Sequence, residues 1–231
     1  MSGFALKMIA LTAMIIDHAG SMLTDLEMRG RFFTSFDVFN LRIAGRIAFP
    51  IYAFFIAEGC KKTRDINKYL LRLAAFALLS EIPYDLFIFH DRLYDFSMQN
   101  VFFTLFFGAL AVKASKSGLP VPLKGALTLG VFSLGYLMKT DYGASGVIFI
   151  WALYYLPEHW QKSASVFIMA AYLYLGSLTS ASFALTAACS VSGLLLALYN
   201  GQKGRGMKWL FYSIYPAHLL VFSCLFFILD K

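Results

Sequence analysis

LRIAGRIAFPIYAFFIAEG, residues 41–59, is apolar enough to enter a lipid bilayer, yet it contains three charged residues and a proline. The charges are Arg42, Arg46 and Glu58, and the proline is Pro50. A charge at the centre of a membrane helix costs about 2.5–3.5 kcal/mol, so such side chains normally face protein or water and find partners. The stretch therefore predicts a membrane helix that contributes to a polar site.

The composition of the whole chain indicates lipid as its solvent. The 231 residues are 59% hydrophobic and 14% charged, with a mean hydropathy of +0.67, whereas soluble domains carry roughly 25% charged residues. The net charge of +7 does not indicate a nucleic-acid partner, because the lysines and arginines are scattered between apolar runs and form no basic stripe. Cys60, Cys189 and Cys224 are too far apart in sequence to predict a disulfide framework or a metal site.

Apolar segments recur along the chain, with no polar region long enough for a second domain. We therefore predict a single all-α integral-membrane domain, residues 1–231, built as a bundle of about nine transmembrane helices, some of them short or re-entrant. The segments are Phe4–Leu23, Leu41–Gly59, Tyr69–Phe89, Asn100–Val112, Pro122–Met138, Gly143–Leu156, Ser163–Leu178, Ser182–Tyr199 and Trp209–Leu229.

The lysines and arginines that flank these segments predict their orientation. With a cytoplasmic N-terminus, thirteen of them fall on cytoplasmic flanks and five on outer flanks. Cytoplasmic flanks of membrane helices are enriched in these residues, so we predict that the N-terminus is inside and the C-terminus outside. The sixth and seventh segments could instead form a hairpin that crosses nothing, and the later segments would keep their orientation either way.

This topology brings polar residues from separate segments to the outer half of the bundle. Arg42 and Arg46 share a helix face because they are four residues apart, and the same holds for Glu81 and Asp85. We expect the two pairs to bind each other, either as a structural clamp or as the wall of a polar chamber that meets substrate. The full set is Asp17, His18, Arg42, Arg46, Glu81, Asp85, Gln99, Asn100, Asp141 and Tyr142.

His18 is a candidate for chemistry in this chamber. A neutral imidazole can accept a proton near neutral pH, as a general base must. The alternative is a hydrogen-bonded histidine that only packs against its neighbours. His218, in the stretch YSIYPAHLLVF, is a second candidate, whereas His90 and His159 are expected in loops.

Lys7 lies on the same face of the first segment as His18, eleven residues away and about 16 Å along the helix axis. It is either an interfacial lysine or the cytoplasmic end of a functional stripe. A basic rim follows the second segment. This rim is either a positive-inside loop with a salt-bridged helix end or a site for an anionic cofactor. Its residues are Glu58, Lys61, Lys62, Arg64 and Arg72.

Several stretches together resemble the TraX family over nearly the whole chain. They are ALKMIALTAMIIDHAG, LRIAGRIAFPIYAFFIAEG, YLLRLAAFALLSEIPYDL, QNVFFTLFFGAL, DYGASGV and FYSIYPAHL. The resemblance implies a polytopic protein of the bacterial cytoplasmic membrane, and the family's namesake is associated with N-terminal acetylation of conjugative pilin. It also implies a distant similarity to acyltransferase family 3, in which a basic residue precedes a catalytic histidine by eleven positions, as Lys7 precedes His18. That family has an RxxR pair, whereas Arg42 and Arg46 are spaced RxxxR.

The resemblance implies an enzyme, a membrane-bound acyltransferase that uses cytosolic acetyl-CoA or another acyl-CoA. Lys7 and the basic rim would hold the phosphates, and His18 would deprotonate an acceptor that arrives from outside. Asp17, Glu81 or Asp85 would orient or stabilise the imidazole, and Arg46, Gln99 or Asn100 would stabilise the oxyanion. The acceptor could be a peptide N-terminus, a sugar or a small molecule.

Two alternatives stay open. Intramembrane Asp, Glu, Arg and His are also used by secondary transporters and proton-coupled permeases. The sequence shows no internal repeat of the kind many transporters have. A non-catalytic scaffold of a conjugation or secretion system is the other alternative, and it would not require a histidine at this depth.

Overall fold

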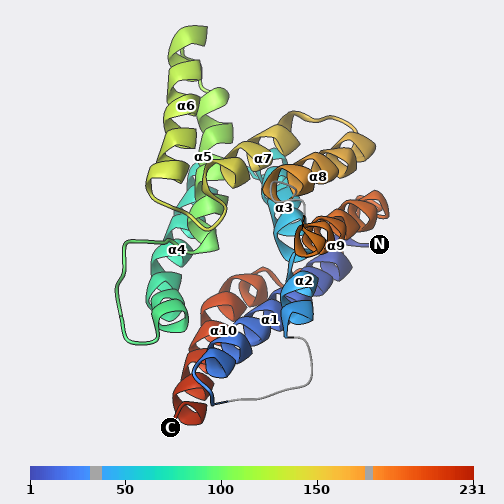
Figure 1. Ribbon diagram of the computed structural model, residues 1–231. Helices are drawn as coiled ribbons and strands as arrows, with labels where there is room; N and C mark the ends of the chain where they lie inside the picture. Colours follow the sequence, from blue (N-terminus) through green and yellow to red (C-terminus); the bar gives the residue numbers. More distant parts are fainter. Residues whose placement is uncertain (32–37, 175–178) are drawn as a thin grey trace. The chain divides into compact units, whose positions relative to one another are not determined.

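The computed structural model describes residues 1–31, 38–174 and 179–231, and all regular structure in them is helical, which confirms the all-α class (Figure 1). Position 178, the predicted end of the seventh segment, lies outside the described residues. The helices are α1 Gly3–Met28, α2 Phe39–Gly45, α3 Ala48–Lys62, α4 Ile66–Phe89, α5 Val101–Ser115, α6 Val121–Leu137, α7 Gly143–Tyr155, α8 His159–Tyr174, α9 Ser180–Ala197 and α10 Lys208–Leu229.

Four stretches of the described chain are long and apolar enough to cross a membrane by length and composition. They are Gly3–Met28, Phe39–Lys62, Ser180–Ala197 and Lys208–Leu229. The surface is also apolar in a pattern that suits lipid. On α4, Leu71, Leu78 and Leu79 are 70%, 68% and 61% exposed and recur at helical spacing. A contiguous apolar stripe of this kind is rare on a soluble monomer, so it fits a membrane protein.

The predicted second segment is not one continuous helix. It divides into α2 and α3, with a break at Arg46 and Ile47. Pro50 explains the break, because proline has no N–H to bond the carbonyl four residues earlier and its ring clashes with that carbonyl. The carbonyl in question belongs to Arg46. Arg46 is the C-cap of α2, and its guanidinium and that of Arg42 contact the same oxygen of Asp17, so the prediction that the two arginines share a helix face is confirmed.

The described chain forms two compact units. The first consists of residues 1–52, 86–91 and 158–231, and it contains α1, α2, α8, α9 and α10. The second consists of residues 53–85 and 92–157, and it contains α5, α6, α7 and most of α3 and α4.

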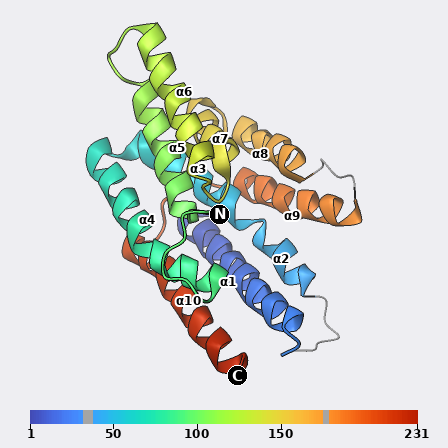
Figure 2. The same ribbon diagram turned by 60° about the vertical axis from the view of Figure 1, so that its left-hand side comes forward.

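In the first unit, α1 and α10 lie side by side and run parallel (Figures 1 and 2). Near their starts, the ammonium of Lys7 lies 5.7 Å from the centre of the Phe211 ring. Near their ends, Arg29 Nη1 donates to Asp230 Oδ2 at 3.0 Å. Residues about 200 positions apart therefore meet along the whole pair.

Helix α2 lies against the C-terminal half of α1 in the opposite direction, with Gly20 facing Leu41 and Gly45 facing Asp17. A Cβ on Gly45 would overlap the Asp17 side chain. The close approach of the two backbones therefore depends on this glycine.

In the second unit, helices α5, α6 and α7 pack around Phe107, Ala111, Val131 and Val147. The C-terminal ends of α3, α5 and α7 meet. Lys61 Nζ donates to Leu156 O at 3.4 Å, and Tyr155 donates to Ser115 Oγ at 2.8 Å. The three helices thus end at one level, as alternating directions along the chain require.

Candidate functional site

A cluster of Asp17, Arg42 and Arg46 occupies the contact between α1 and α2. Arg46 Nη2 lies 2.8 Å from Asp17 Oδ1, and Arg42 Nε lies 3.5 Å from the same oxygen. Arg46 Nε also donates to Arg42 O at 3.1 Å. The three side chains carry one net positive charge, and the Asp17 and Arg46 side chains are only 13% and 17% exposed. The cluster thus places a fixed, partly buried cation inside an apolar segment.

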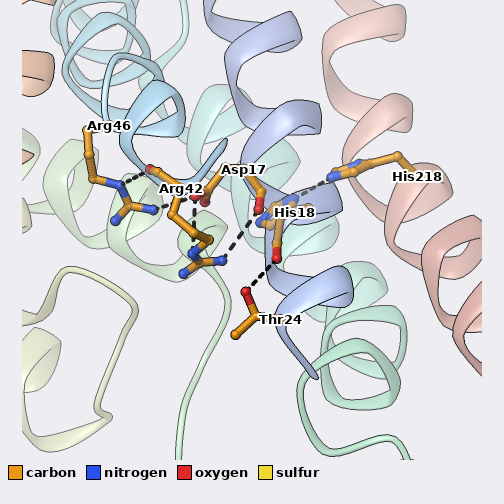
Figure 3. A network of polar contacts seen from close by, with 7 residues as sticks. Asp17, His18, Thr24, Arg42, Arg46 and His218 are labelled. Atoms are coloured by element: carbon orange, nitrogen blue, oxygen red, sulfur yellow. Dashed lines mark hydrogen bonds and ion pairs between the residues drawn. The ribbon is translucent and has the colours of Figure 1, made fainter. Parts of the chain in front are cut away.

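His18 points to the other side of α1, toward α10. Figure 3 shows Asp17 turned to the arginines and His18 turned to His218. His18 Nδ1 and His218 Nε2 are 2.6 Å apart. The rings of Phe87 and Tyr215 flank His18 edge-on, with centroids 5.3 and 6.2 Å away. The adjacent residues Asp17 and His18 therefore serve different partners, as the 100° between successive helical residues requires.

A cavity of about 600 Å³ opens beside the arginine cluster, inside the first unit. Its wall has both signs of charge, which suits a polar ligand better than a lipid chain. The lining residues are Ser21, Thr24, Asp25, Glu27, Val38, Phe39, Arg42, Arg46 and Leu185. Because α1 contributes residues 21–27, the cavity lies toward the predicted outer end of the helix.

The second unit brings together residues that the sequence analysis assigned to the outer level. The Asn100 side chain donates to Glu81 Oε2 and, at 2.8 Å, to Ala77 O. Its Oδ1 accepts from Phe102 N at 3.0 Å and so caps α5. Gln99 N donates to Lys139 O at 3.1 Å. The part of α4 around Ala77 and Glu81 is thereby joined to the start of α5 and to the turn before α7.

Tyr142 stands at the N-cap position of α7, where its N–H donates to Thr104 Oγ1 at 3.4 Å. The neighbouring Asp141 is exposed, whereas Thr104 is fully buried. Thr104 was missed from sequence because a threonine inside an apolar run gives no signal of a polar contact.

Helix α4 has two carboxylates that each include a buried oxygen without a hydrogen-bond partner in the described chain. Asp85 Oδ2 accepts from Asp95 N at 2.9 Å, but Asp85 Oδ1 and Glu81 Oε1 are buried without a hydrogen-bond partner in the described chain. The hydrogen bond from Asp95 N to Asp85 joins the loop after α4 to this helix. Hydrogen bonds from Ser97 and then from Arg92 lower the pKa of the Asp95 carboxyl to about 2.

The predicted phosphate contacts are divided between the units. Lys7 belongs to the first unit, whereas Glu58, Lys61, Lys62, Arg64 and Arg72 belong to the second. Lys62 Nζ pairs with Glu58 Oε2 at 3.0 Å, the salt-bridged helix end that the sequence allowed. Lys61 and Lys116 both lie 5.3 Å from the centre of the Tyr154 ring. This aromatic-basic cluster was only partly anticipated, because its members come from three helices.

One further expectation needs correction. The arginine pair was expected to bind Glu81 and Asp85, but Asp17 is the carboxylate that both guanidiniums contact. His90 follows the end of α4 in a loop, as expected, and it is buried there. Its Nε2 lies 3.2 Å from Asp25 Oδ2, and its ring stacks on Phe226 with centroids 3.6 Å apart.

His159, also expected in a loop, opens α8 and packs edge-on against Tyr199. A thiol near the arginines was missed as well. Cys189 on α9 is buried and interacts electrostatically with Arg46.

The apolar helices and the buried charged clusters define an all-α membrane protein. Residues 2–226 match the TraX protein family, so the chain belongs to that family. It is also similar to the probable fimbrial assembly protein FimC, serogroup H1, of Dichelobacter nodosus. The two are 32% identical over 237 residues, which cover 94% of this chain and 93% of the relative. No solved structure matches the chain.

Proposed function

We propose that this TraX-family chain is a multi-pass acyltransferase of the bacterial cytoplasmic membrane. It would transfer an acetyl or other acyl group from cytosolic acyl-CoA to an amine or hydroxyl acceptor at the outer face. One observation carries the proposal: His18 has one ring nitrogen bound to His218 and, among the described residues, no hydrogen-bond partner at the other. A general base requires such a free nitrogen within reach of its substrate.

The donor side of the proposed site follows one face of α1. Lys7 and His18 both face α10, at Phe211 and His218, and they are separated by about 16 Å of helix rise. An ammonium held over an aromatic ring near the cytoplasmic end suits a phosphate of acyl-CoA. The thioester would then lie farther along the helix, close to His18.

The acceptor would have to approach the free Nε2 of His18 on the α10 side of α1, because the mixed-charge cavity beside Arg42 and Arg46 lies against α2 and His18 does not line it. The acceptor loses its proton to His18 as its electron pair forms a bond to the thioester carbonyl carbon. Collapse of the intermediate breaks the carbon–sulfur bond. The CoA thiolate leaves and takes up the proton that His18 had accepted from the acceptor.

The relative's name adds a biological setting. The Dichelobacter nodosus protein is named as a fimbrial assembly protein. We therefore extend the proposal to an acceptor that belongs to a fimbrial assembly system, and the amino terminus of an exported subunit is the simplest such acceptor. An assay that offers the purified protein a peptide amine and a sugar in separate reactions distinguishes these two classes of acceptor.

The test is transfer of a labelled acetyl group from acetyl-CoA to a peptide amine by protein reconstituted in liposomes. His18→Ala is expected to lower turnover by about 100-fold or more. His90→Gln changes a buried histidine outside the proposed site and should retain turnover. Wild-type turnover in His18→Ala would remove His18 from the chemistry.

Cys189→Ser tests whether the acyl group passes through this thiol, and retained turnover would support direct transfer.

A proton- or cation-coupled transporter is a second candidate, and the buried unpartnered oxygens of Glu81 and Asp85 favour it. Such carboxylates are where a transporter would bind a proton or cation. Flux into proteoliposomes without acyl-CoA, abolished by Asp85→Asn, would support this candidate over the acyltransferase.

A further inference from the structure

The contact between His18 and His218 fixes more than the position of two rings. Their planes differ by only 21°, and the ring centroids are 4.9 Å apart, whereas Nδ1 of His18 and Nε2 of His218 are separated by 2.6 Å. Because the nitrogens are much closer than the centroids, the rings meet edge to edge. One N–H···N hydrogen bond therefore joins them, and it contains one proton.

The other nitrogen of His218 decides which ring donates that proton. His218 Nδ1 lies 2.7 Å from Ile214 O, one helical turn earlier. A carbonyl oxygen only accepts, so this nitrogen must hold a hydrogen. A neutral histidine holds a hydrogen on one ring nitrogen, and Nε2 of His218 is then an acceptor.

The tautomer of His218 also determines the tautomer of His18. If His218 Nε2 accepts, then His18 Nδ1 donates, and the lone pair of neutral His18 is at Nε2. In the described chain no hydrogen bond occupies this Nε2. The backbone carbonyl of Ile214 thus selects, through two rings, the tautomer of His18 that can act as a base. His218 thus fixes the tautomer and orientation of His18, a role that a carboxylate has in many other histidine sites.

We propose that His218 is a positioning residue that holds His18 in the tautomer with hydrogen on Nδ1 and a free base at Nε2. This proposal rests on the acyltransferase function for its catalytic meaning. In the reaction, the acceptor proton moves to His18 Nε2, and the imidazolium keeps donating from Nδ1 to His218. His218 therefore stabilises the charged base without touching the acceptor or the acyl group.

The tautomers can be measured without any turnover. The full chain is labelled with ¹⁵N in its histidine rings, reconstituted in nanodiscs, and studied by NMR correlations that distinguish protonated from unprotonated ring nitrogens. Wild-type His18 is expected to have hydrogen on Nδ1. His218→Gln keeps an acceptor oxygen near the position of Nε2 and should keep this tautomer. His218→Leu removes the acceptor, and His18 should shift toward hydrogen on Nε2.

The result that overturns the proposal is a wild-type His18 with hydrogen on Nε2, or a tautomer that does not change in His218→Leu. His90→Gln is the matched control, since His90 is a buried histidine that stacks on the same helix at Phe226. It should leave the His18 signals in place. His218→Gln also guards against misfolding, because it keeps a polar group of similar length at the same position.

Kinetics then connect the His18–His218 contact to the acyltransferase. His218→Leu should lower kcat by about 100-fold or more with little change in KM for acetyl-CoA, and His218→Gln should recover most of the rate. A purely structural role for His218 would change both constants or neither. A wild-type protein with the expected tautomers but no acetyl transfer would reject the proposed function and leave the His18–His218 geometry established.

Discussion

At the scale of single residues, Asp17 is the carboxylate on which the arginine cluster depends. Replacing one member of a partly buried ion pair leaves the other charge uncompensated, at a cost of about 3–5 kcal/mol for buried pairs. Arg46→Gln is expected to cost less than this range, about 1.5–3 kcal/mol, because it removes a charged hydrogen bond but leaves Arg42 Nε 3.5 Å from Asp17 Oδ1. Unfolding in mixed detergents measures the change.

The chain offers a matched pair for this experiment. Arg29 and Asp230 are joined at 3.0 Å, but their side chains are 47% and 25% exposed. Surface pairs contribute about 0–1 kcal/mol, so Arg29→Gln should have little effect. Equal losses in Arg29→Gln and Arg46→Gln would show that burial does not strengthen the Asp17 contact.

Lys7 tests the donor side of the proposed reaction. Lys7→Glu places a negative charge where a phosphate is proposed, so it should raise KM for acyl-CoA more than it lowers kcat. Steady-state kinetics of acetyl transfer separate the two constants. Lys208→Glu makes the same charge change at an exposed position at the start of α10 and serves as the control. An unchanged KM in Lys7→Glu would reject the phosphate contact.

Sequence patterns predicted the arrangement of some of these residues and not of others. Spacing placed Lys7 and His18 on one face of a helix, and both side chains do face α10. The 100° step between neighbours also separated Asp17 from His18. The partner of His18 could not be predicted, because His218 is 200 residues away and no local pattern connects parallel helices so distant in sequence.

At the scale of helices, the contact between α1 and α2 depends on the absence of a side chain. Gly45→Ala would place a methyl group against Asp17, so the helices must separate. Overpacking typically costs about 1–3 kcal/mol, and we expect a loss in that range together with weaker pairing of Arg46 and Asp17. Thermal unfolding in detergent, followed by circular dichroism, measures the loss.

Gly125→Ala is the control for this substitution. Gly125 is also helical, in α6, but nothing lies within 4 Å of the position of its Cβ. Alanine favours a helix over glycine by up to about 1 kcal/mol, so this variant should be neutral or more stable. If Gly45→Ala behaved like Gly125→Ala, the close approach of α1 and α2 would not be required.

The sequence predicted the positions of several helices better than it predicted their continuity. Apolar length predicted α1, α9 and α10 closely, since runs of this kind satisfy their backbone groups only as helices in lipid. The break before α3 was not predicted, although Pro50 was noticed in the same stretch. The hydropathy of a segment is insensitive to one missing hydrogen bond, so hydropathy alone does not predict the break.

At the scale of the whole chain, the direction of α10 relative to α1 limits the topology. The main-chain N–H groups of Gly3 and Phe4 donate to Gln202 and Lys203 at 2.8 and 3.0 Å, so α1 and α10 begin next to each other. Two parallel membrane helices that begin on one side also end on one side. We therefore predict that Met1 and Lys231 lie on opposite sides of the membrane. The distribution of lysine and arginine predicts that Met1 is on the inner side.

Reporter fusions test this topology directly. Green fluorescent protein fluoresces when it remains in the cytoplasm, whereas alkaline phosphatase becomes active only after export. Fused after Lys231, the phosphatase should be active and the fluorescent protein dark. Fused after Gly201, in the loop beside Met1, the two reporters should give the opposite result, because Asn200 N donates to Met1 O at 2.9 Å. Fluorescence from both fusions would place both ends of α10 in the cytoplasm and would contradict the predicted topology.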